Sequence, residues 1–450
     1  MSKAQKPKKP VVPVQTKKAP VAAKNPQDNV LYKALWYGAL IFLAVLFIKQ
    51  MGTDGPKKKE KKSKASVADW LSGYFQENYE KEMLGKPFFV GLKKYRDEKE
   101  YSLLGKVNLD DCFSGKENYV FGERMTSSYF GDDFKGDAAI KEEVRKAQYV
   151  QTKLKEYGIE LLILFAPGKA TIYPEFLPDD ALKTEMKTTN SKVYIEECQK
   201  QNVNHIDFIK YFLSLKKSTS YPLFPQYGSH WSYFAECVAI DTTIKRLQNL
   251  MNVNLPDLKF GDIRLMDTAL VRDGDIFRKM SIDIPKGYPL AYPQQIGYEQ
   301  GEGVAPQKIL GIGDSYFRGF FYLGAMQNAF NNSQQWYYYN SIIPESPDNP
   351  EIWELDLKTE IMKTKAVLIL CNENNLENLG NGFIDDAFLL FSDPVKYDLD
   401  RKEKYQINTN KKKIRNDKEM LYRLTKESHQ RGITLDSLIT ETAVKLSGKS

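Results

Sequence analysis

The stretch Lys308-Ile309-Leu310-Gly311-Ile312-Gly313-Asp314-Ser315 is an apolar run followed directly by a polar turn. Residues 308–312 have the composition of a buried strand, and residues 316–330 have that of a helix. A serine between a strand and a helix lies above the sheet edge, where the first free N–H groups of the helix point. Such a serine can attack an ester while these N–H groups hold the oxyanion. The same tripeptide is common in ordinary turns, so this interpretation needs support from the rest of the chain.

Other apolar segments of strand length alternate with helical patterns. Residues 161–165, 203–206 and 366–371 are predicted strands, and residues 140–157 and 231–250 have apolar residues at helical spacing. Strands separated by helices predict an α/β fold of three layers, with a parallel sheet covered by helices on both faces. Ligands in such folds bind at the C-terminal ends of the strands, and Ser315 follows such an end.

Composition divides the chain into segments. A turn-rich stretch, residues 251–306, is interpreted as an inserted lid or substrate-contacting region. Thr434 is expected to cap the last helix. The predicted order is a disordered basic tail (1–29), a transmembrane helix (30–49), a charged linker (50–66), a helical neck (67–117), the α/β domain (118–396) and a C-terminal helical extension (397–450).

The net charge of +7 is concentrated at one end. Residues 1–64 contain 15 Lys, no Arg and 3 acidic residues, which gives +12, so the other 386 residues carry −5. A nucleic-acid-binding domain carries its basic patch on the folded body, so this distribution argues against nucleic acid as a partner. The four cysteines form no C-x-x-C pair and match no zinc spacing, and we expect neither a metal nor a cofactor.

Residues 30–48 are apolar except for Lys33, and their length is close to the ~20 residues that cross a bilayer. Lys33 can extend to the headgroups, and Trp36 and Tyr37 suit the interface. We therefore predict a single-span anchor. Lysines flank the span on both sides, and those nearest to it favour a cytoplasmic C-terminal side.

A nucleophilic serine needs a base, and the chain has three histidines. His429 lies among charged helices and is interpreted as a surface residue, and His205 lies in a short strand and is interpreted as structural. His230 stands in Tyr227-Gly228-Ser229-His230-Trp231-Ser232, directly before a long helix. A base at such a junction can lean over a sheet edge, so His230 is the candidate, although an ordinary helix-start residue has the same pattern.

A Gly-Asp-Ser turn together with a His-Trp pair at a helix start resembles the SGNH-hydrolase-like domain of the alginate O-acetyltransferase group, the AlgX and AlgJ type. Further motifs are similar to that domain in type and order, and the resemblance runs from about residue 65 to the end. These motifs are Asn118-Tyr119-Val120-Phe121, Tyr129-Phe130-Gly131-Asp132-Asp133-Phe134, Phe165-Ala166-Pro167-Gly168-Lys169, Ile172-Tyr173-Pro174-Glu175 and Leu177-Pro178.

The resemblance implies Ser315 as nucleophile and His230 as general base. It also implies transfer of an acetyl group to a hydroxyl of an exported or cell-envelope polysaccharide, with a multi-span membrane O-acyltransferase as the acetyl donor. Because exported glycans are modified outside the cytoplasm, it places the protein in a bacterial inner membrane with the large domain in the periplasm.

One position departs from the family pattern. The family has Asp-x-His, in which the aspartate orients the imidazole, and the matching residue here is Gly228. Loss of an orienting acid costs several orders of magnitude in rate. Asp314, Glu373 or a backbone carbonyl are the candidate substitutes.

The remaining site candidates come from the turns after two strands. The N–H of Ser315 is the expected oxyanion donor, with Asn374 or Asn375 as a side-chain donor, although either asparagine also suits a helix cap or turn. Arg318 is expected to contact the substrate or to pair with an acid. Residues predicted to line the substrate site are Arg318, Tyr316, Trp231, Asn374, Asn375 and Glu373.

Three alternative functions remain open from the sequence. A carbohydrate esterase or deacetylase would use the same residues. A non-catalytic glycan-binding scaffold of an export complex is favoured by Gly228. A cytoplasmic protein tethered to the membrane is favoured by the position of the lysines.

Overall fold

The computed structural model describes residues 36–38, 40–41, 80, 83–270, 272–280, 282–283, 287 and 289–448. The predicted tail and linker, and most of the predicted membrane segment, lie outside these ranges. Within the described part of the chain, no helix combines the length and the apolar composition needed to cross a membrane. The chain divides into two compact units, residues 1–66 and 67–450, and the fold given below is that of the second.

The central sheet has six strands in the order β11-β10-β9-β12-β3-β4. All neighbouring pairs are parallel except β10 and β11. The prediction of a parallel sheet is therefore wrong at this edge, because the short turn from Tyr337 to Ser341 allows only a hairpin. The strands are β3 (Glu160–Ala166), β4 (His205–Asp207), β9 (Ile309–Gly313), β10 (Gln334–Tyr337), β11 (Ser341–Ile343) and β12 (Ala366–Asn372).

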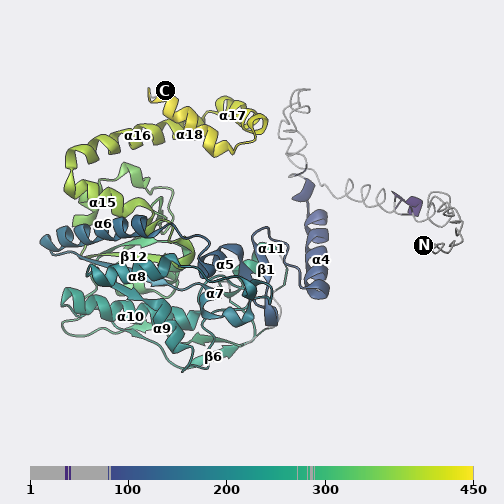
Figure 1. The fold of residues 1–450 in the computed structure, drawn as a ribbon, viewed down its shortest axis with the longest axis horizontal. Coiled ribbons are helices and arrows are strands. Elements are labelled where there is room, and N and C mark those ends of the chain that lie inside the picture. Colours follow the sequence, from purple (N-terminus) through teal and green to yellow (C-terminus); the bar gives the residue numbers. More distant parts are fainter. Residues whose placement is uncertain are drawn as a thin grey trace, which may run out of the picture. The chain divides into compact units, whose positions relative to one another are not determined.

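Alternate residues of the central strands feed two apolar layers. On β3, Leu162 and Leu164 join the layer with α9, α10, α12 and α13, whereas Leu161, Ile163 and Phe165 join the layer with α6, α8, α14 and α15. Figure 1 shows α6 and α15 on one side of the sheet and α9 and α10 on the other. The predicted three-layer arrangement is confirmed, and the C-terminal ends of β3, β9 and β12 meet at one edge.

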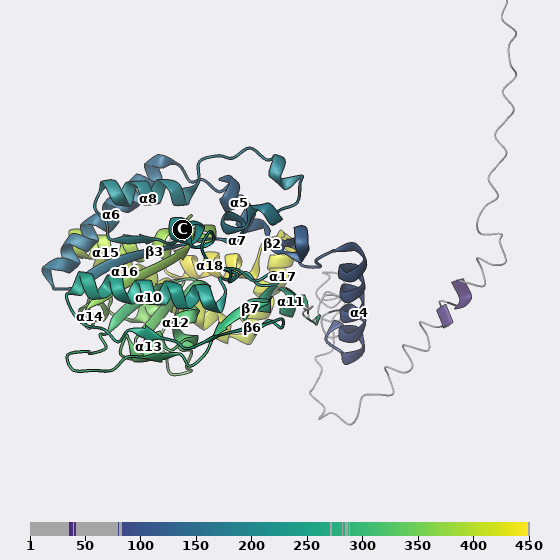
Figure 2. The ribbon, with the colours of Figure 1, turned by 90° about the horizontal axis from the view of Figure 1, so that it is seen from below.

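The helices of the two layers have these bounds: α5 (Glu123–Phe130), α6 (Asp137–Glu156), α7 (Lys169–Ile172), α8 (Asn190–Lys200), α9 (Phe208–Leu215), α10 (Tyr233–Met251), α12 (Gly319–Tyr322), α13 (Ala325–Asn328), α14 (Leu357–Met362) and α15 (Phe383–Ser392). Figure 2 shows α10, α12 and α13 together beneath the sheet.

The single helix predicted over residues 316–330 is broken into three short pieces. A 3-10 turn, Ser315–Arg318, leads into α12, and α13 follows after Gly324. Gly324 has φ +78°, a left-handed conformation that interrupts a helix. The prediction of one continuous helix is therefore wrong, because this glycine interrupts it.

The predicted lid, residues 251–306, is built from two short antiparallel ribbons and one helix. Strand β5 (Leu258–Lys259) pairs with β8 (Gly297–Tyr298), and β6 (Ile263–Met266) pairs with β7 (Leu290–Pro293). The helix α11 (Asp275–Met280) lies between β6 and β7 in the sequence. Strands β1 (Cys112–Ser114) and β2 (Val120–Gly122) form a further ribbon before the main sheet, preceded by α4 (Pro87–Leu104).

Three helices follow the sheet domain: α16 (Pro394–Asn416), α17 (Lys418–Arg431) and α18 (Leu435–Leu446). They share a small core of their own, which includes Ile414, Leu424 and Leu438. The hydroxyl of Thr434 accepts the N–H of Ser437, which confirms the predicted cap of the last helix. Figure 1 shows these helices in yellow at the end of the chain.

The start of α12 approaches α10 very closely. A Cβ atom at Gly319 would overlap the carboxylate of Glu236, which is buried. That carboxylate cannot move freely, because it accepts the indole N–H of Trp231 at 3.0 Å and two N–H bonds from Arg272 at 2.7 and 2.6 Å. Glycine is therefore needed here for space.

We expect Gly319→Ala to lower the free energy of unfolding by about 1–3 kcal/mol, the usual cost of overpacking a rigid core. Chemical denaturation followed by circular dichroism would measure it. Gly91→Ala in α4 is the matched control, because no atom lies within 4 Å of a Cβ there. Equal stability of the two variants would show that Glu236 and its partners Trp231 and Arg272 can shift to accommodate a methyl group at position 319.

Candidate active site

Ser315 stands directly after β9, and the side chain of Asp314 fixes its position. Asp314 is fully buried, and its Oδ1 accepts the N–H of Tyr316 at 2.9 Å. Its Oδ2 accepts the N–H of Asn372 and an amide N–H of Asn375, both at 2.8 Å. Asp314 therefore ties the serine turn to the end of β12. It was predicted as a substitute for the orienting acid, but its oxygens are directed to this turn.

Ser315 and His230 meet, although 85 positions separate them in the chain. The distance from His230 Nε2 to Ser315 Oγ is 2.8 Å. His230 comes from the loop before α10, whose start is capped by Ser232. The predicted proximity of these two side chains is thus present, at the distance that proton transfer requires.

The carboxylate beside His230 belongs to Asp275, the first residue of α11. Asp275 Oδ2 lies 3.1 Å from His230 Nδ1. The hydroxyl of Ser229 donates to the same oxygen at 2.5 Å, and the Ser229 N–H donates to Asp275 Oδ1 at 2.7 Å. With Nδ1–H donated to Asp275, Nε2 is free to accept the proton of Ser315. The side chains of Ser315, His230 and Asp275 therefore form a Ser-His-Asp arrangement.

The electrostatics of Asp275 suit this role. Burial disfavours its charge, but the hydrogen bond and charge of His230 and the bonds from Ser229 outweigh burial and lower its pKa to about 2. The carboxylate therefore stays ionised at any pH at which the imidazole acts as a base.

Gly228 explains why the acid comes from another part of the chain. A Cβ atom at Gly228 would lie 2.8 Å from the carbonyl oxygen of Asp273 and 2.8 Å from Pro225 Cγ. The backbone just before α11 thus occupies the space that a side chain at 228 would need. The N–H of Ile276 also donates to the carbonyl of Tyr227 at 3.2 Å, which holds α11 against the His230 loop.

Lys169 and Tyr173, from the motifs between Phe165 and Glu175, bond to the backbone of the segment that leads to His230. The fully buried Lys169 ammonium donates to the carbonyls of Val120 at 2.8 Å and Gln226 at 3.1 Å. Burial lowers the pKa of Lys169 to about 7. The hydroxyl of Tyr173 accepts the N–H of Leu223 at 2.9 Å. These motif residues therefore position the base and do not contact the reacting atoms.

Tyr316 and Trp231, both predicted to bind substrate, are buried behind the histidine. The Tyr316 hydroxyl donates to the Ser229 carbonyl at 2.8 Å, and its ring centre lies 5.0 Å from that of His230 and 5.2 Å from that of Trp231. Trp231 donates its indole N–H to Glu236. Both therefore support His230 and are buried by the fold, and substrate contact through them stays a prediction.

Arg318 is partly exposed beside the serine turn. It pairs with Glu345 at 2.9 Å and lies over the ring of Tyr337, 4.8 Å from its centre. This confirms pairing with an acid, and substrate contact stays a prediction.

Tyr338, which sequence reasoning did not select, lies closer to the nucleophile. Its hydroxyl interacts with the side chains of Ser315 and Asn375, and burial raises its pKa to about 12, so it remains a donor. Tyr338 has φ +48°, a strained conformation for a bulky residue and one that is frequent at functional sites.

The residues after β12 serve mainly to build this edge. The Oδ1 of Asn374 accepts the Ser128 hydroxyl at 3.2 Å, and Asn375 donates to Asp314. Buried Glu373 accepts the Thr171 hydroxyl and does not reach His230 in the described structure, so it is not the orienting acid. Burial raises the pKa of Glu373 to about 7.

Some backbone N–H groups around Ser315 bond within the turn, and one is directed to the candidate site. The N–H groups of Tyr316 and Phe317 bond to Asp314. The Ser315 N–H has no acceptor among the described residues outside its own short helix, which suits the predicted oxyanion donor. No group of three or more His, Cys, Asp or Glu side chains in the described chain has the arrangement of a metal site.

Residues 125–295 match the protein-family model of the SGNH hydrolase-like domain of the acetyltransferase AlgX. This part of the chain is therefore similar to an AlgX-type SGNH hydrolase-like domain. The matched range contains His230, Gly228 and Asp275 and ends 20 residues before Ser315. The SGNH-like fold with a mixed sheet agrees with the predicted fold class.

Comparison with curated protein sequences gives no match. Among solved structures, the O-acetyltransferase domain of Pseudomonas putida AlgJ is 15% identical with a TM-score of 0.38, and the alignment covers 62% of this chain and 98% of that one. Pseudomonas aeruginosa AlgX is 12% identical with a TM-score of 0.43, over 63% and 69% of the two chains. Bacillus cereus PatB1 is 10% identical with a TM-score of 0.36, over 58% and 95%.

Asp275 of this SGNH-like domain was not predicted because its segment was read only as a lid. A weak signal was present: Asp273-Gly274-Asp275 precedes an apolar helical turn, as a helix start does. Nothing in the sequence connects that turn to Gly228, 47 positions earlier.

We expect Asp275→Asn to lower the rate of Ser315 labelling by an active-site sulfonyl fluoride by roughly 10⁴, because an amide cannot hold the productive imidazole tautomer. Mass spectrometry of the labelled peptide would measure the rate. Asp273→Asn is the control, since Asp273 is bonded to Tyr292 instead. Unchanged labelling of Asp275→Asn would contradict a role in orienting His230.

Glu373→Gln tests the cost of the buried carboxyl. The folded-state pKa of Glu373 is about 7, above its ordinary 4.5, so its stability contribution decreases as pH rises from 4.5 to 7. We expect the variant to be more stable than the parent by about 1–3 kcal/mol at pH 8 and by much less at pH 4. Denaturation at both pH values measures this, and a pH-independent difference would contradict it.

Proposed function

We propose that this protein transfers acetyl groups to hydroxyls of an exported or cell-envelope polysaccharide through an acyl-serine at Ser315. The observation that carries the proposal is the hydrogen bond between His230 Nε2 and Ser315 Oγ, with Asp275 on the other ring nitrogen. The family match of residues 125–295 to the AlgX acetyltransferase domain supports the acyl-transfer class.

The first half of the reaction forms the acyl-enzyme. Ser315 Oγ attacks the acetyl carbonyl carbon while His230 Nε2 takes its proton, and Asp275 stabilises the imidazolium. The Ser315 N–H stabilises the oxyanion. When the intermediate collapses, the bond to the donor's leaving group breaks, and His230 returns the proton to that group.

The second half uses the same residues in reverse. A sugar hydroxyl attacks the acyl carbon and gives its proton to His230, and Ser315 Oγ leaves and takes that proton back. Transfer in place of hydrolysis requires that the sugar hydroxyl outcompete water. The Tyr338 hydroxyl, beside Ser315, is placed to contact either the acyl group or the acceptor.

A multi-span membrane O-acyltransferase is the proposed source of the acetyl group. The segment 30–48 is the proposed anchor in a bacterial inner membrane, with the enzyme domain in the periplasm. Arg318 remains a proposed substrate contact at the edge of the site. Esterase activity is the second candidate, because water can use the same three side chains.

Acceptor competition separates transferase from esterase. The full-length protein is incubated with p-nitrophenyl acetate and a set of oligosaccharides, and we expect acetylated sugar to form at the expense of free acetate. Ser315→Ala should abolish both products, since no nucleophile remains. Acetate alone at every acceptor concentration would establish an esterase, and unchanged acetylation in Ser315→Ala would contradict the proposed nucleophile.

A further inference from the structure

The face of α16 that is turned towards the sheet domain is polar. Tyr397, Arg401, Lys404, Asn408, Lys412 and Arg415 recur at intervals of three or four residues and line one pocket, so they share one side of the helix. A helix that packs on a domain normally turns an apolar stripe towards it. The polar stripe instead leaves a pocket of about 580 Å³ between α16 and the edge of the sheet.

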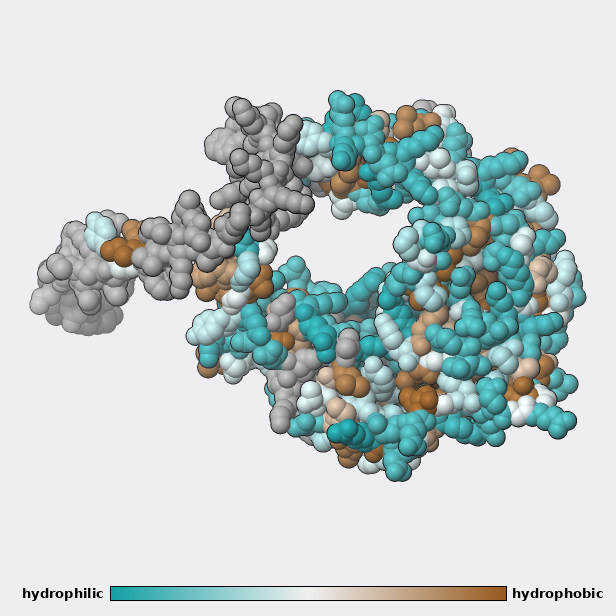
Figure 3. Space-filling model, turned by 180° about the vertical axis from the view of Figure 1, so that it is seen from behind, coloured by the Kyte–Doolittle hydropathy of each residue, from teal (hydrophilic) through white to brown (hydrophobic). Residues whose placement is uncertain are grey.

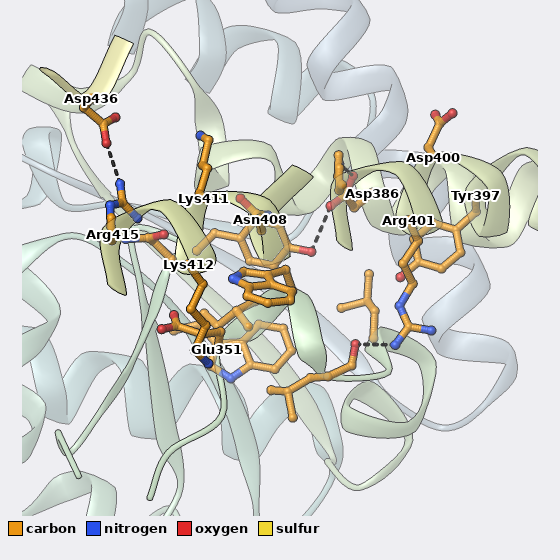
Figure 4. A pocket seen from close by; sticks show the side chains of 18 of the residues that line it. Glu351, Asp386, Tyr397, Asp400, Arg401, Asn408, Lys411, Lys412, Arg415 and Asp436 are labelled. Carbon is orange, nitrogen blue, oxygen red and sulfur yellow. Dashed lines mark hydrogen bonds and ion pairs between the residues drawn. The ribbon is translucent and has the colours of Figure 1, made fainter. Parts of the chain in front are cut away.

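Aromatic side chains form the opposite wall of this pocket. Tyr339 follows β10 and Trp353 comes from a 3-10 turn before α14, and both are partly exposed. Trp336 of β10 is buried behind them. The Lys412 ammonium lies over the Trp353 ring, 5.9 Å from its centre. Figure 4 shows Arg401 and Lys412 extending from α16 towards this wall. The pocket therefore combines flat apolar rings with hydrogen-bonding groups.

Most cations that line the pocket are paired with an acid. Lys404 pairs with Asp386 at 2.5 Å, and Arg415 pairs with Asp436 at 2.5 Å. Lys412 is paired with Glu354 at 3.3 Å and Arg401 with Asp356 at 3.4 Å. The other two charged residues of α16 in the lining, Asp400 and Lys411, have opposite signs and point away from the rings (Figure 4). The lining holds five cations, Arg401, Lys404, Lys411, Lys412 and Arg415, and four acids, Glu351, Asp386, Asp400 and Asp436. Glu354 and Asp356 pair with two of these cations from outside the lining, so the site has no strong cationic excess to offer a polyanion.

The pocket and the candidate active site share one turn of the chain. The Tyr338 N–H donates to the carbonyl of Gly313, two residues before Ser315, at 2.9 Å, whereas the next residue, Tyr339, lines the pocket and donates its hydroxyl to Asp386 at 3.0 Å. Both tyrosines are left-handed, with φ +48° and +51°, and this conformation carries the chain from one site to the other. Asn340 continues the pocket wall. The pocket and the Ser315 turn are therefore joined through the consecutive residues Tyr338 and Tyr339.

We propose that the pocket beneath α16 binds a neutral carbohydrate segment, so that the polymer modified at Ser315 is held at a second place. Sugar rings present C–H faces that pack on aromatic rings and hydroxyls that bond to amides and charged groups, which is the combination found here. The face of the molecule in Figure 3 is mostly hydrophilic, with hydrophobic residues scattered over it. The choice of ligand rests on the proposed function, but the binding itself does not require catalysis.

The test uses the full-length chain carrying Ser315→Ala, so that binding is measured without turnover. Cellohexaose, maltohexaose and chitohexaose are the neutral probes, hexagalacturonic acid is the anionic probe of equal length, and calorimetry or ligand-observed NMR gives Kd. We expect at least one neutral probe to bind more tightly than the anionic one. Trp353→Ala should weaken that binding at least tenfold, and Trp353→Phe should restore most of it.

Lys412→Ala and Lys413→Ala form a matched pair on α16, because Lys413 is exposed and does not line the pocket. We expect only the first to weaken binding, so the test stands even if Trp353→Ala fails to fold. Tighter binding of hexagalacturonic acid, equal binding by both lysine variants, or no binding of any neutral probe at millimolar concentration would overturn the proposal. Absence of acetyl transfer by the chain with Ser315 intact, together with neutral-sugar binding by the Ser315→Ala chain, would instead count against the proposed function alone.

Discussion

The close approach of the chain at Gly228 determines the form of the site. The carbonyl of Asp273 lies where a side chain at position 228 would begin, and this contact places Asp275 beside His230. The hydroxyl and N–H of Ser229 then both bond to the Asp275 carboxylate. The departure from Asp-x-His is thus a relocation of the carboxylate, and it removes the observation that favoured a non-catalytic scaffold.

Two buried charged groups hold the halves of the site in register. Asp314 joins the serine turn to β12 through three N–H donors, and Lys169 joins the His230 loop to β2 through two backbone carbonyls. Burying such groups is costly unless their hydrogen bonds are satisfied, and each is bonded to backbone that would otherwise be free to shift. The 2.8 Å contact between Ser315 and His230 depends on both connections.

Much of the fold was predictable because its signals are local. The apolar runs that became β3, β9 and β12, the helical pattern over residues 140–157 and the Thr434 cap need only a few neighbouring residues to be recognised. The hairpin edge strand and the broken helix after Ser315 were missed, because a tight turn and a single left-handed glycine decided them. Ser315 was recognised as a serine at a strand-to-helix turn, and His230 as a histidine in a loop directly before a long helix.

The sequence by itself therefore determined the α/β class, the strand that carries Ser315 and the histidine that faces it, since residue type and spacing encode these features directly. Only the tertiary structure decided which carboxylate completes the site, where Tyr338 lies, and that α16 leaves a polar pocket over the sheet edge. Each of these is a contact between segments distant in the chain. Such contacts depend on where the folded backbone leaves space for a side chain. The order of residue types along the chain does not contain that information.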